Sequence, residues 1–268
     1  MSKYYGIFQE IKDLYKKEII EYGIYENVFS EIYSDLQSVS GELDYYLENA
    51  YCVGKDVLEI CCGDGLNYMI PMAKKGFHVD GVEISESMIQ QFETKCAKLP
   101  TKVKNNLHIY KSDIYEFQPE HKYDLIIIPS TTICLLSDND EAIKKLFIKI
   151  YEWLNPGGRF MFDYRVDQII GNLNNSEIMS LCNQKEKYFM IMQEFVNYVP
   201  GRSVVNMYVQ KSDNEGEHKF IASSDKRIIS DELINYLTDV TKFVVMNKYM
   251  LHSHNIDICL MVLEKQGE

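Results

Sequence analysis

A short apolar run that leads into two closely spaced glycines constrains the fold of this chain more than any other feature. The run spans Val57 to Ile60, and Gly63-x-Gly65 follows it before a helix-compatible segment begins. This order predicts a strand, a tight turn and the start of a helix. Glycine lets the backbone turn sharply and approach a ligand, and the free N–H groups at a helix start face negative charge. The sequence therefore predicts a site for a nucleotide-like ligand.

The residues around this turn disfavour a dinucleotide. The third position of a dinucleotide fingerprint takes Gly or Ala for close helix–strand packing, whereas this chain has Tyr68. Glu59 lies inside the strand, four residues before Gly63, where a pyrophosphate gains nothing from a carboxylate. An acidic residue at this point suits a cationic ligand better.

With this motif the chain resembles the class I S-adenosylmethionine (SAM)-dependent methyltransferases, whose first motif is an acidic residue, three residues and Gly-x-Gly. SAM carries an ammonium and a sulfonium, so the resemblance agrees with the charge argument. The resemblance implies a doubly wound, Rossmann-like α/β fold with a seven-stranded sheet, SAM as cofactor and S-adenosylhomocysteine as product. It assigns the cofactor loop to Glu59, Cys61, Gly63 and Gly65.

Further motifs match the family in order along the chain. Residues 77–83 predict a second strand, and Glu83 at its end is the candidate acceptor for the ribose hydroxyls. Ser85 is expected to cap the following helix. A third predicted strand, Leu107 to Tyr110, leads to Asp113, which the resemblance places at the adenine amino group. The other cofactor contacts implied by the resemblance are Ile84, Met88, Ile114 and Pro129.

The remaining predicted strands complete the sheet. Residues 123–128 predict a fourth strand that is apolar apart from Asp124, as expected of a parallel strand buried on both faces. Leu154-Asn155-Pro156-Gly157-Gly158 matches the Leu-x-Pro-Gly-Gly signature of the family before a fifth strand. Residues 243–250 and 256–262 predict two final strands, the first parallel to the others and the second antiparallel.

Composition limits the partners. The 268 residues, 46% of them hydrophobic, suffice for a doubly wound core. The net charge of −12 and only four arginines disfavour a nucleic-acid substrate. Seven cysteines without a Cys-x-x-Cys pair suggest neither disulfides nor a metal site. No 18-residue apolar run or signal sequence is present, so we expect a cytoplasmic protein without a membrane partner. We expect it to be a monomer or a homodimer.

We expect three parts in the chain. Residues 1–50, with apolar groups at helical spacing, form an N-terminal helical cap. Residues 51–166 and 231–268 form the SAM-binding core. Residues 167–230 contain β-rich runs around Pro200-Gly201 and form an antiparallel β insertion that acts as a substrate lid. Such an insertion resembles small-molecule N-methyltransferases, including those that act on amino sugars of natural-product pathways.

Two tyrosines of the N-terminal segment are candidate site residues. The segment from Tyr25 to Tyr33 looks like the Tyr-containing opening of small-molecule methyltransferases, in which such a Tyr closes over SAM. We expect both side chains at the cofactor and assign Tyr33 a catalytic role near the sulfonium. Packing of these rings in the core is the alternative.

Polar residues that follow the predicted strands are candidates for the acceptor site. His252 and His254 lie in the turn between the last two strands, where a histidine suits proton removal near neutral pH; a polar turn without catalytic duty is the alternative. The acceptor-pocket candidates follow strands at the carboxyl edge or end the insertion: Ser130, Thr131, Thr132, Tyr164, Arg165 and Arg227.

The activity follows from the cofactor. The methyl of a sulfonium is already activated, so positioning of the acceptor in a dry pocket supplies most of the rate. We expect methyl transfer to an amine nitrogen of a small molecule or small peptide. An O-methyltransferase, a non-catalytic SAM-binding protein and an NAD oxidoreductase are the alternatives.

Overall fold

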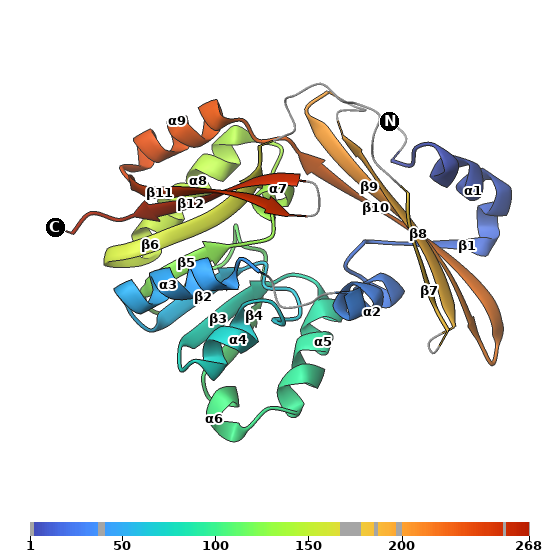
Figure 1. The fold of residues 1–268 in the computed structure, drawn as a ribbon, viewed down its shortest axis with the longest axis horizontal. Helices are drawn as coiled ribbons and strands as arrows, with labels where there is room; N and C mark the ends of the chain where they lie inside the picture. The colour runs from blue at the N-terminus through green and yellow to red at the C-terminus, as the bar shows by residue number, and fades with distance from the viewer. Residues whose placement is uncertain are drawn as a thin grey trace. The chain divides into compact units, whose positions relative to one another are not determined.

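The computed structural model describes residues 3–36, 41–166, 178–184, 187–196, 200–253 and 256–267. The chain divides into two compact units, each with its own sheet (Figure 1). One unit combines Met1–Tyr33 with Gln168–Ile228, and the other combines Ser34–Asp167 with Ile229–Glu268. We call them the β unit and the core unit, and describe each by itself.

The core unit contains a seven-stranded sheet in the order β11-β12-β6-β5-β2-β3-β4. The strands from β4 to β6 are parallel, whereas β12 runs antiparallel to both β6 and β11. The chain winds outward in both directions from β2, so the expected doubly wound fold is confirmed. The strands are β2 (Asp56–Ile60), β3 (His78–Glu83), β4 (Leu107–Lys111), β5 (Tyr123–Ile128), β6 (Leu154–Arg165), β11 (Val244–Ser253) and β12 (Ile256–Glu264).

Helices cover both faces of this sheet because its central strands are apolar on both sides (Figure 1). On β5, Ile126 and Ile128 pack toward α8 and α9, whereas Leu125 and Ile127 pack toward α3 and α4. The helices of the unit are α3 (Leu43–Val53), α4 (Met69–Lys74), α5 (Glu86–Ala97), α6 (Thr101–Lys104), α7 (Ile133–Leu136), α8 (Asp140–Trp153) and α9 (Asp231–Thr241).

The helix α5 begins as the sequence predicts. The Ser85 hydroxyl accepts a hydrogen bond from the Met88 N–H at 3.3 Å, which satisfies one of the free donors of the first turn. The start of α5 therefore lies directly after the carboxyl end of β3.

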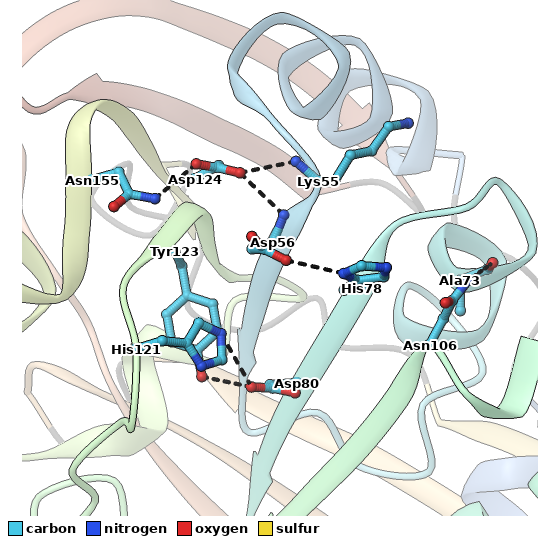
Figure 2. A network of polar contacts seen from close by, with 10 residues as sticks. All are labelled: Lys55, Asp56, Ala73, His78, Asp80, Asn106, His121, Tyr123, Asp124 and Asn155. Atoms are coloured by element: carbon cyan, nitrogen blue, oxygen red, sulfur yellow. Dashed lines mark hydrogen bonds and ion pairs between the residues drawn. The ribbon is translucent and has the colours of Figure 1, made fainter.

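The amino ends of the strands carry a network of polar contacts (Figure 2). One Asp124 oxygen accepts the N–H groups of Lys55 at 2.9 Å and Asp56 at 3.2 Å, and the other accepts from the Asn155 amide at 2.8 Å. This carboxylate ties the start of β2 to β5 and to the turn at the start of β6. The network lies at the edge of the sheet opposite the cofactor loop.

Aspartate and histidine side chains extend this network (Figure 2). His78 contacts Asp56 at 3.2 Å, and Asp80 accepts from the Tyr123 hydroxyl at 2.7 Å. These side chains line a cleft of about 340 Å³. His78 on β3 pairs with Asp56 on the adjacent strand β2, whereas Tyr123 on β5 reaches Asp80 on β3 across β2.

The β unit contains a five-stranded sheet in the order β1-β10-β9-β8-β7. All neighbours are antiparallel except β1, which runs parallel to β10. The elements are α1 (Ile7–Tyr15), η1 (Lys16–Glu18), β1 (Ile19–Tyr22), α2 (Asn27–Leu36), β7 (Met179–Asn183), β8 (Tyr188–Val196), β9 (Arg202–Asp213) and β10 (Gly216–Arg227).

The expected N-terminal helical cap needs a correction. Ile19–Tyr22 forms a strand, because a β-branched and aromatic run followed by Gly23 pairs along β10. On α1, Leu14 is 72% exposed, whereas Phe8 is fully buried. The helix α3 begins within residues 1–50, at Leu43, but belongs to the core unit. The role of the antiparallel strands as a lid stays a prediction.

Candidate functional site

The cofactor loop follows β2 with a backbone that repeatedly enters the left-handed region. Gly63 has a φ of +57° and Gly65 of +69°, and Cys61 has a φ of 57° without being a glycine. A Cβ on Gly65 would lie 2.7 Å from a ring carbon of Phe92, so packing requires glycine there. A Cβ on Gly63 would meet no described atom within 4 Å. Gly63 therefore borders open space on the loop.

Glu83 fastens this loop to the end of β3. One of its carboxylate oxygens accepts the Gly63 N–H at 2.9 Å, and the other accepts the N–H groups of Ile84 at 2.9 Å and Ser85 at 2.8 Å. The residue is 8% exposed. A carboxylate offers about four lone-pair positions, so capacity remains for a ligand hydroxyl.

Glu59 is a buried carboxyl beneath the same loop. It is 3% exposed, and burial raises the pKa of this carboxyl well above its ordinary value, with Asp64 and Glu83 adding to the shift. A hydrogen bond from the Met69 N–H acts in the opposite direction. Its Oε2 has no hydrogen-bond partner among the described residues. A buried carboxyl oxygen left open in an acidic neighbourhood fits a cationic ligand.

Asp64 is a loop residue whose importance sequence reasoning missed. It is 3% exposed and forms an ion pair with Lys95 of α5 at 3.0 Å. Its other oxygen accepts the Leu66 N–H at 3.0 Å. The loop is thus fixed to α5 as well as to β3. The only sequence signal was an acidic residue between two glycines.

The remaining predicted cofactor residues lie at the ends of β3 and β4. Ile84 is 64% exposed, Asp113 is exposed, and Met88 and Ile114 are buried. Burial raises the pKa of the Cys61 thiol, and the charges of Glu83 and Asp113 raise it further. The carboxylates of both strand ends therefore act on one point of the loop.

The loop after β5 adopts a strained backbone next to the cofactor-side strands. Ser130 has a φ of 61° and Thr131 of 55°, two consecutive non-glycine residues in the left-handed region. Pro129 is buried, Ser130 is exposed, and Thr131 and Thr132 are half-buried. We call residues 129–132 the β5 loop.

Asp163 of β6 holds the β5 loop, and sequence reasoning did not identify it. It is 1% exposed and accepts the N–H groups of Ser130 at 2.8 Å and of Thr131, together with the Tyr46 hydroxyl at 2.9 Å. Burial, with a smaller contribution from Glu42, raises the pKa of Asp163 to about 6, although its three donors act to lower it.

Two predicted acceptor residues lie next to Asp163 on β6. Tyr164 is 1% exposed and donates its hydroxyl to Asp231 of α9 at 2.5 Å. Burial raises the pKa of this phenol. The side chain packs in the core on the α8 and α9 face, and this favours a packing role over the predicted substrate contact. Arg165 is half-buried and lies opposite Ile258 in the register of β12.

The other predicted catalytic and substrate residues belong to other parts of the chain. His252 lies on β11 opposite Asp257 in register, and His254 lies outside the described residues. Tyr25, Tyr33 and Arg227 belong to the β unit, where the rings of the two tyrosines meet edge to face at 5.3 Å. Their roles stay predictions.

In the described part of the chain, no three His, Cys, Asp or Glu side chains are placed to hold a metal ion. No helix there combines the length and apolarity needed to cross a bilayer.

Comparison with known proteins agrees with this geometry. Residues 57–158 match the family model described as a methyltransferase domain, so the class expected from the sequence is confirmed for this segment. The fold is shared with solved SAM-dependent methyltransferases. The CcbJ methyltransferase from Streptomyces caelestis aligns with a TM-score of 0.71 at 16% identity, over 91% of this chain and 99% of that one. The sugar N-methyltransferase KedS8 from Streptoalloteichus gives 0.71 at 13% identity, over 91% and 94%.

Curated relatives include enzymes with different acceptors. Malonyl-[acyl-carrier protein] O-methyltransferase 2 of Ilyobacter polytropus is 32% identical over 40% of this chain and 38% of its own length. Phosphoethanolamine N-methyltransferase of Plasmodium falciparum is 25% identical over 91% of this chain and 79% of its own length. The first two curated relatives are matched over less than half of their length, 46% and 38%.

Proposed function

We propose that the protein transfers a methyl group from SAM to an amine nitrogen of a small molecule or small peptide. The observation that supports this most directly is the set of buried carboxyls at the cofactor loop, Glu59, Asp64 and Glu83. Their negative potential favours a cationic ligand and a cationic product. Among the relatives, the phosphoethanolamine and sugar N-methyltransferases carry names that agree with an amine acceptor.

Residues of the core unit would hold the cofactor. Glu83 has lone pairs left for the ribose hydroxyls, and we assign the adenine amino group to Asp113, an exposed residue after β4. The open side of Gly63 leaves the backbone accessible, and Oε2 of Glu59 behind the loop has no hydrogen-bond partner among the described residues. When bound, SAM supplies a methyl group on a positively charged sulfur.

The work of the protein is then positioning and exclusion of water. The β5 loop offers three hydroxyls and its backbone groups from a fixed conformation, which suits orientation of an acceptor. An ammonium acceptor must lose a proton before its lone pair reacts. Removing the ammonium from water favours the neutral form of the amine.

An oxygen acceptor is the second candidate, because the relative with 32% identity is named an O-methyltransferase. An alcohol or carboxyl acceptor would use the same cofactor loop and differ only at the acceptor. The two candidates are therefore separated by the product and not by cofactor binding.

The product of a labelled reaction tests the proposal. The protein is incubated with SAM that carries a trideuterated methyl group and with a small-molecule extract of its host. We expect new ions that carry one or more labels, and fragmentation that places the label on nitrogen. The Gly63→Leu variant is the matched control and should give none. Label on oxygen would favour the second candidate, and S-adenosylhomocysteine binding without any labelled ion would favour a non-catalytic binding protein.

The two histidines are the proposed bases. His252→Ala and His254→Ala should each be compared with wild type across pH 6 to 9 on the product found above. A general base typically contributes on the order of 10²-fold to turnover, and its loss flattens the acid limb of the pH profile. Unchanged turnover in both variants would assign the turn a structural role only.

A further inference from the structure

Asp163 is a fully buried carboxylate that the cofactor site does not use. It lies on β6, 32 residues from the β5 loop in sequence, and accepts two consecutive backbone N–H groups of that loop. The third donor is the hydroxyl of Tyr46 on α3, which lies 117 residues from Asp163 in the sequence. One side chain thus joins β6, α3 and the loop.

The β5 loop needs such an anchor because its backbone is strained. Ser130 and Thr131 both have φ near +60°, and a β-branched residue such as Thr131 rarely adopts this conformation. The turn that follows adds hydrogen bonds from Thr132 N–H to Pro129 at 3.2 Å and from Cys134 N–H to Thr131 at 3.1 Å. Those bonds also occur in unstrained turns. The two bonds to Asp163 are the contacts that select the left-handed conformation.

The partners of Asp163 are fixed in turn. Tyr46 is fully buried, and its ring packs against Tyr68 edge to face, with 5.0 Å between the centroids. The Tyr68 hydroxyl donates to Glu42 at 3.2 Å, and Tyr68 directly precedes α4 beyond the cofactor loop. Asp163 is therefore held by side chains that belong to the same layer as the cofactor loop.

We propose that Asp163 is the positioning residue of the methyl acceptor, which acts by holding the β5 loop in the conformation that presents Ser130 and Thr131 to the acceptor. This inference rests on the proposed function, because it assumes that the β5 loop contacts the acceptor. Asp163 is too deeply buried to touch a ligand itself. Its loss should therefore change acceptor use and leave cofactor binding intact.

The charge of Asp163 contributes to its hold on the β5 loop. The titratable groups that interact with it are Glu42 and Tyr46 on the α3 side and Cys259 on β12, and Tyr68 acts on Tyr46 in turn. Burial sets its pKa to about 6. Protonation would turn one acceptor oxygen into a donor opposite a backbone N–H. The surroundings of the Ser130 and Thr131 N–H groups should therefore change as the pH passes through about 6.

The experiment compares Asp163→Asn with Asp124→Asn. Asp124 also accepts two backbone N–H groups, but at the amino edge of the sheet. Initial rates of labelled-methyl transfer are measured in a dilution series of the host extract, and S-adenosylhomocysteine binding is measured by calorimetry. We expect Asp163→Asn to raise the half-saturating extract concentration at least tenfold and to keep S-adenosylhomocysteine affinity within threefold. Asp124→Asn should change neither.

A second substitution that relieves the backbone strain of the β5 loop should restore acceptor use in Asp163→Asn. Adding Thr131→Gly to Asp163→Asn lets the loop adopt a positive φ without its anchor, because glycine carries no Cβ. We expect the half-saturating concentration to return most of the way to wild type. A merely structural role of Asp163 would lower stability in both variants and give no rescue.

Amide resonances separate a failure of this inference from a failure of the proposed function. The Ser130 and Thr131 N–H signals should shift with a midpoint near pH 6 in the wild type and should not do so in Asp163→Asn. This readout needs no acceptor, so it holds even if no labelled product appears. Amide signals insensitive to pH, or unchanged acceptor use in Asp163→Asn, would overturn the positioning role.

Discussion

The two edges of the seven-stranded sheet use carboxylates in different ways. At the amino edge, Asp56 has a side chain that is 44% exposed and pairs with His78, and Asp124 receives the first N–H groups of β2 (Figure 2). At the carboxyl edge, Glu83 and Asp163 are buried and bond to loop N–H groups at Gly63, Ser130 and Thr131, all at positive φ.

The difference separates anchoring for stability from anchoring for function. An exposed carboxylate at the end of a strand costs little and stabilises the fold modestly. A buried carboxylate that holds a left-handed loop lowers the stability of the fold in two ways: the carboxylate is desolvated and the loop backbone is strained. A chain keeps such an arrangement where the loop geometry matters to a ligand. The carboxyl edge is therefore the edge at which substitutions should change binding more than stability.

The largest effect is expected from a bulky side chain on the cofactor loop. Gly63→Leu fills the open space beside the loop, so we expect S-adenosylhomocysteine affinity to fall roughly a thousandfold, or about 4 kcal/mol, by calorimetry. Gly76→Leu is the matched control, because Gly76 has a φ of +88°, equally open surroundings and a place between α4 and the amino end of β3.

Both glycine variants should lose stability to a similar extent. A left-handed leucine costs of order 1–3 kcal/mol of unfolding free energy in either place. Only the Gly63 variant should lose the ligand. Affinity of Gly63→Leu within tenfold of wild type would contradict the assignment of the cofactor loop.

The pH dependence of stability should come from the carboxyl edge. The folded-state pKa of Asp163 is raised from 3.8 to about 6, so the stability it contributes is complete below about pH 4 and is lost as the pH rises through about 6. Relative to Asp163→Asn, the wild-type unfolding free energy should fall by about 3 kcal/mol between pH 4 and 7. Denaturant titrations at several pH values measure this difference.

Glu59 should act in the same direction. Its folded-state pKa lies well above 4.5, so its contribution to stability is also lost as the pH rises. Glu59→Gln should flatten the pH dependence, and it should weaken S-adenosylhomocysteine binding if the open oxygen meets a cationic group. A wild-type stability that rises relative to both variants between pH 4 and 7 would contradict this view of the carboxyl edge.

Replacing one carboxylate by an amide at either edge of the sheet should have a smaller effect. Glu83→Gln replaces one acceptor oxygen by a donor opposite backbone N–H groups, so we expect S-adenosylhomocysteine to bind about tenfold more weakly. Asp124→Asn makes the same change at Lys55 and Asp56. We expect it to lower the unfolding free energy by about 1–2 kcal/mol and to leave the affinity unchanged. Equal losses of affinity in both variants would remove the distinction between the edges.

Local signals in the sequence predicted most of the core unit. Apolar runs bounded by polar turns located β2 and β5 to within a residue, and Ser85 was identified as a cap from its place before α5. Glu83 followed from its spacing to Gly63. These features are set by residues close in the chain, and for that reason a pattern along the sequence reveals them.

Contacts between distant residues were missed. The bonds of Asp163 to the β5 loop span 32 and 33 residues, and the Asp64–Lys95 ion pair spans 31. Tyr164 was predicted at the acceptor site because it follows the fifth predicted strand, but it lies on β6 beside Asp163, and neighbours on a strand point to opposite faces. Asp163 therefore reaches the loop while Tyr164 reaches Asp231. The strand β1 was missed because only pairing with β10 makes it one.

The smallest effect is expected at Cys61, which tests whether the loop works through its backbone. Cys61 adopts a φ of 57° that glycine adopts without strain, so Cys61→Gly removes strain while it removes a partly buried side chain. These changes oppose each other, and the unfolding free energy should move by less than about 1 kcal/mol. Burial raises the pKa of the thiol and keeps it protonated near neutral pH, so no thiolate chemistry is lost. S-adenosylhomocysteine affinity should stay within threefold of wild type, whereas a tenfold loss would show that the cofactor loop binds through this side chain as well as through its N–H groups.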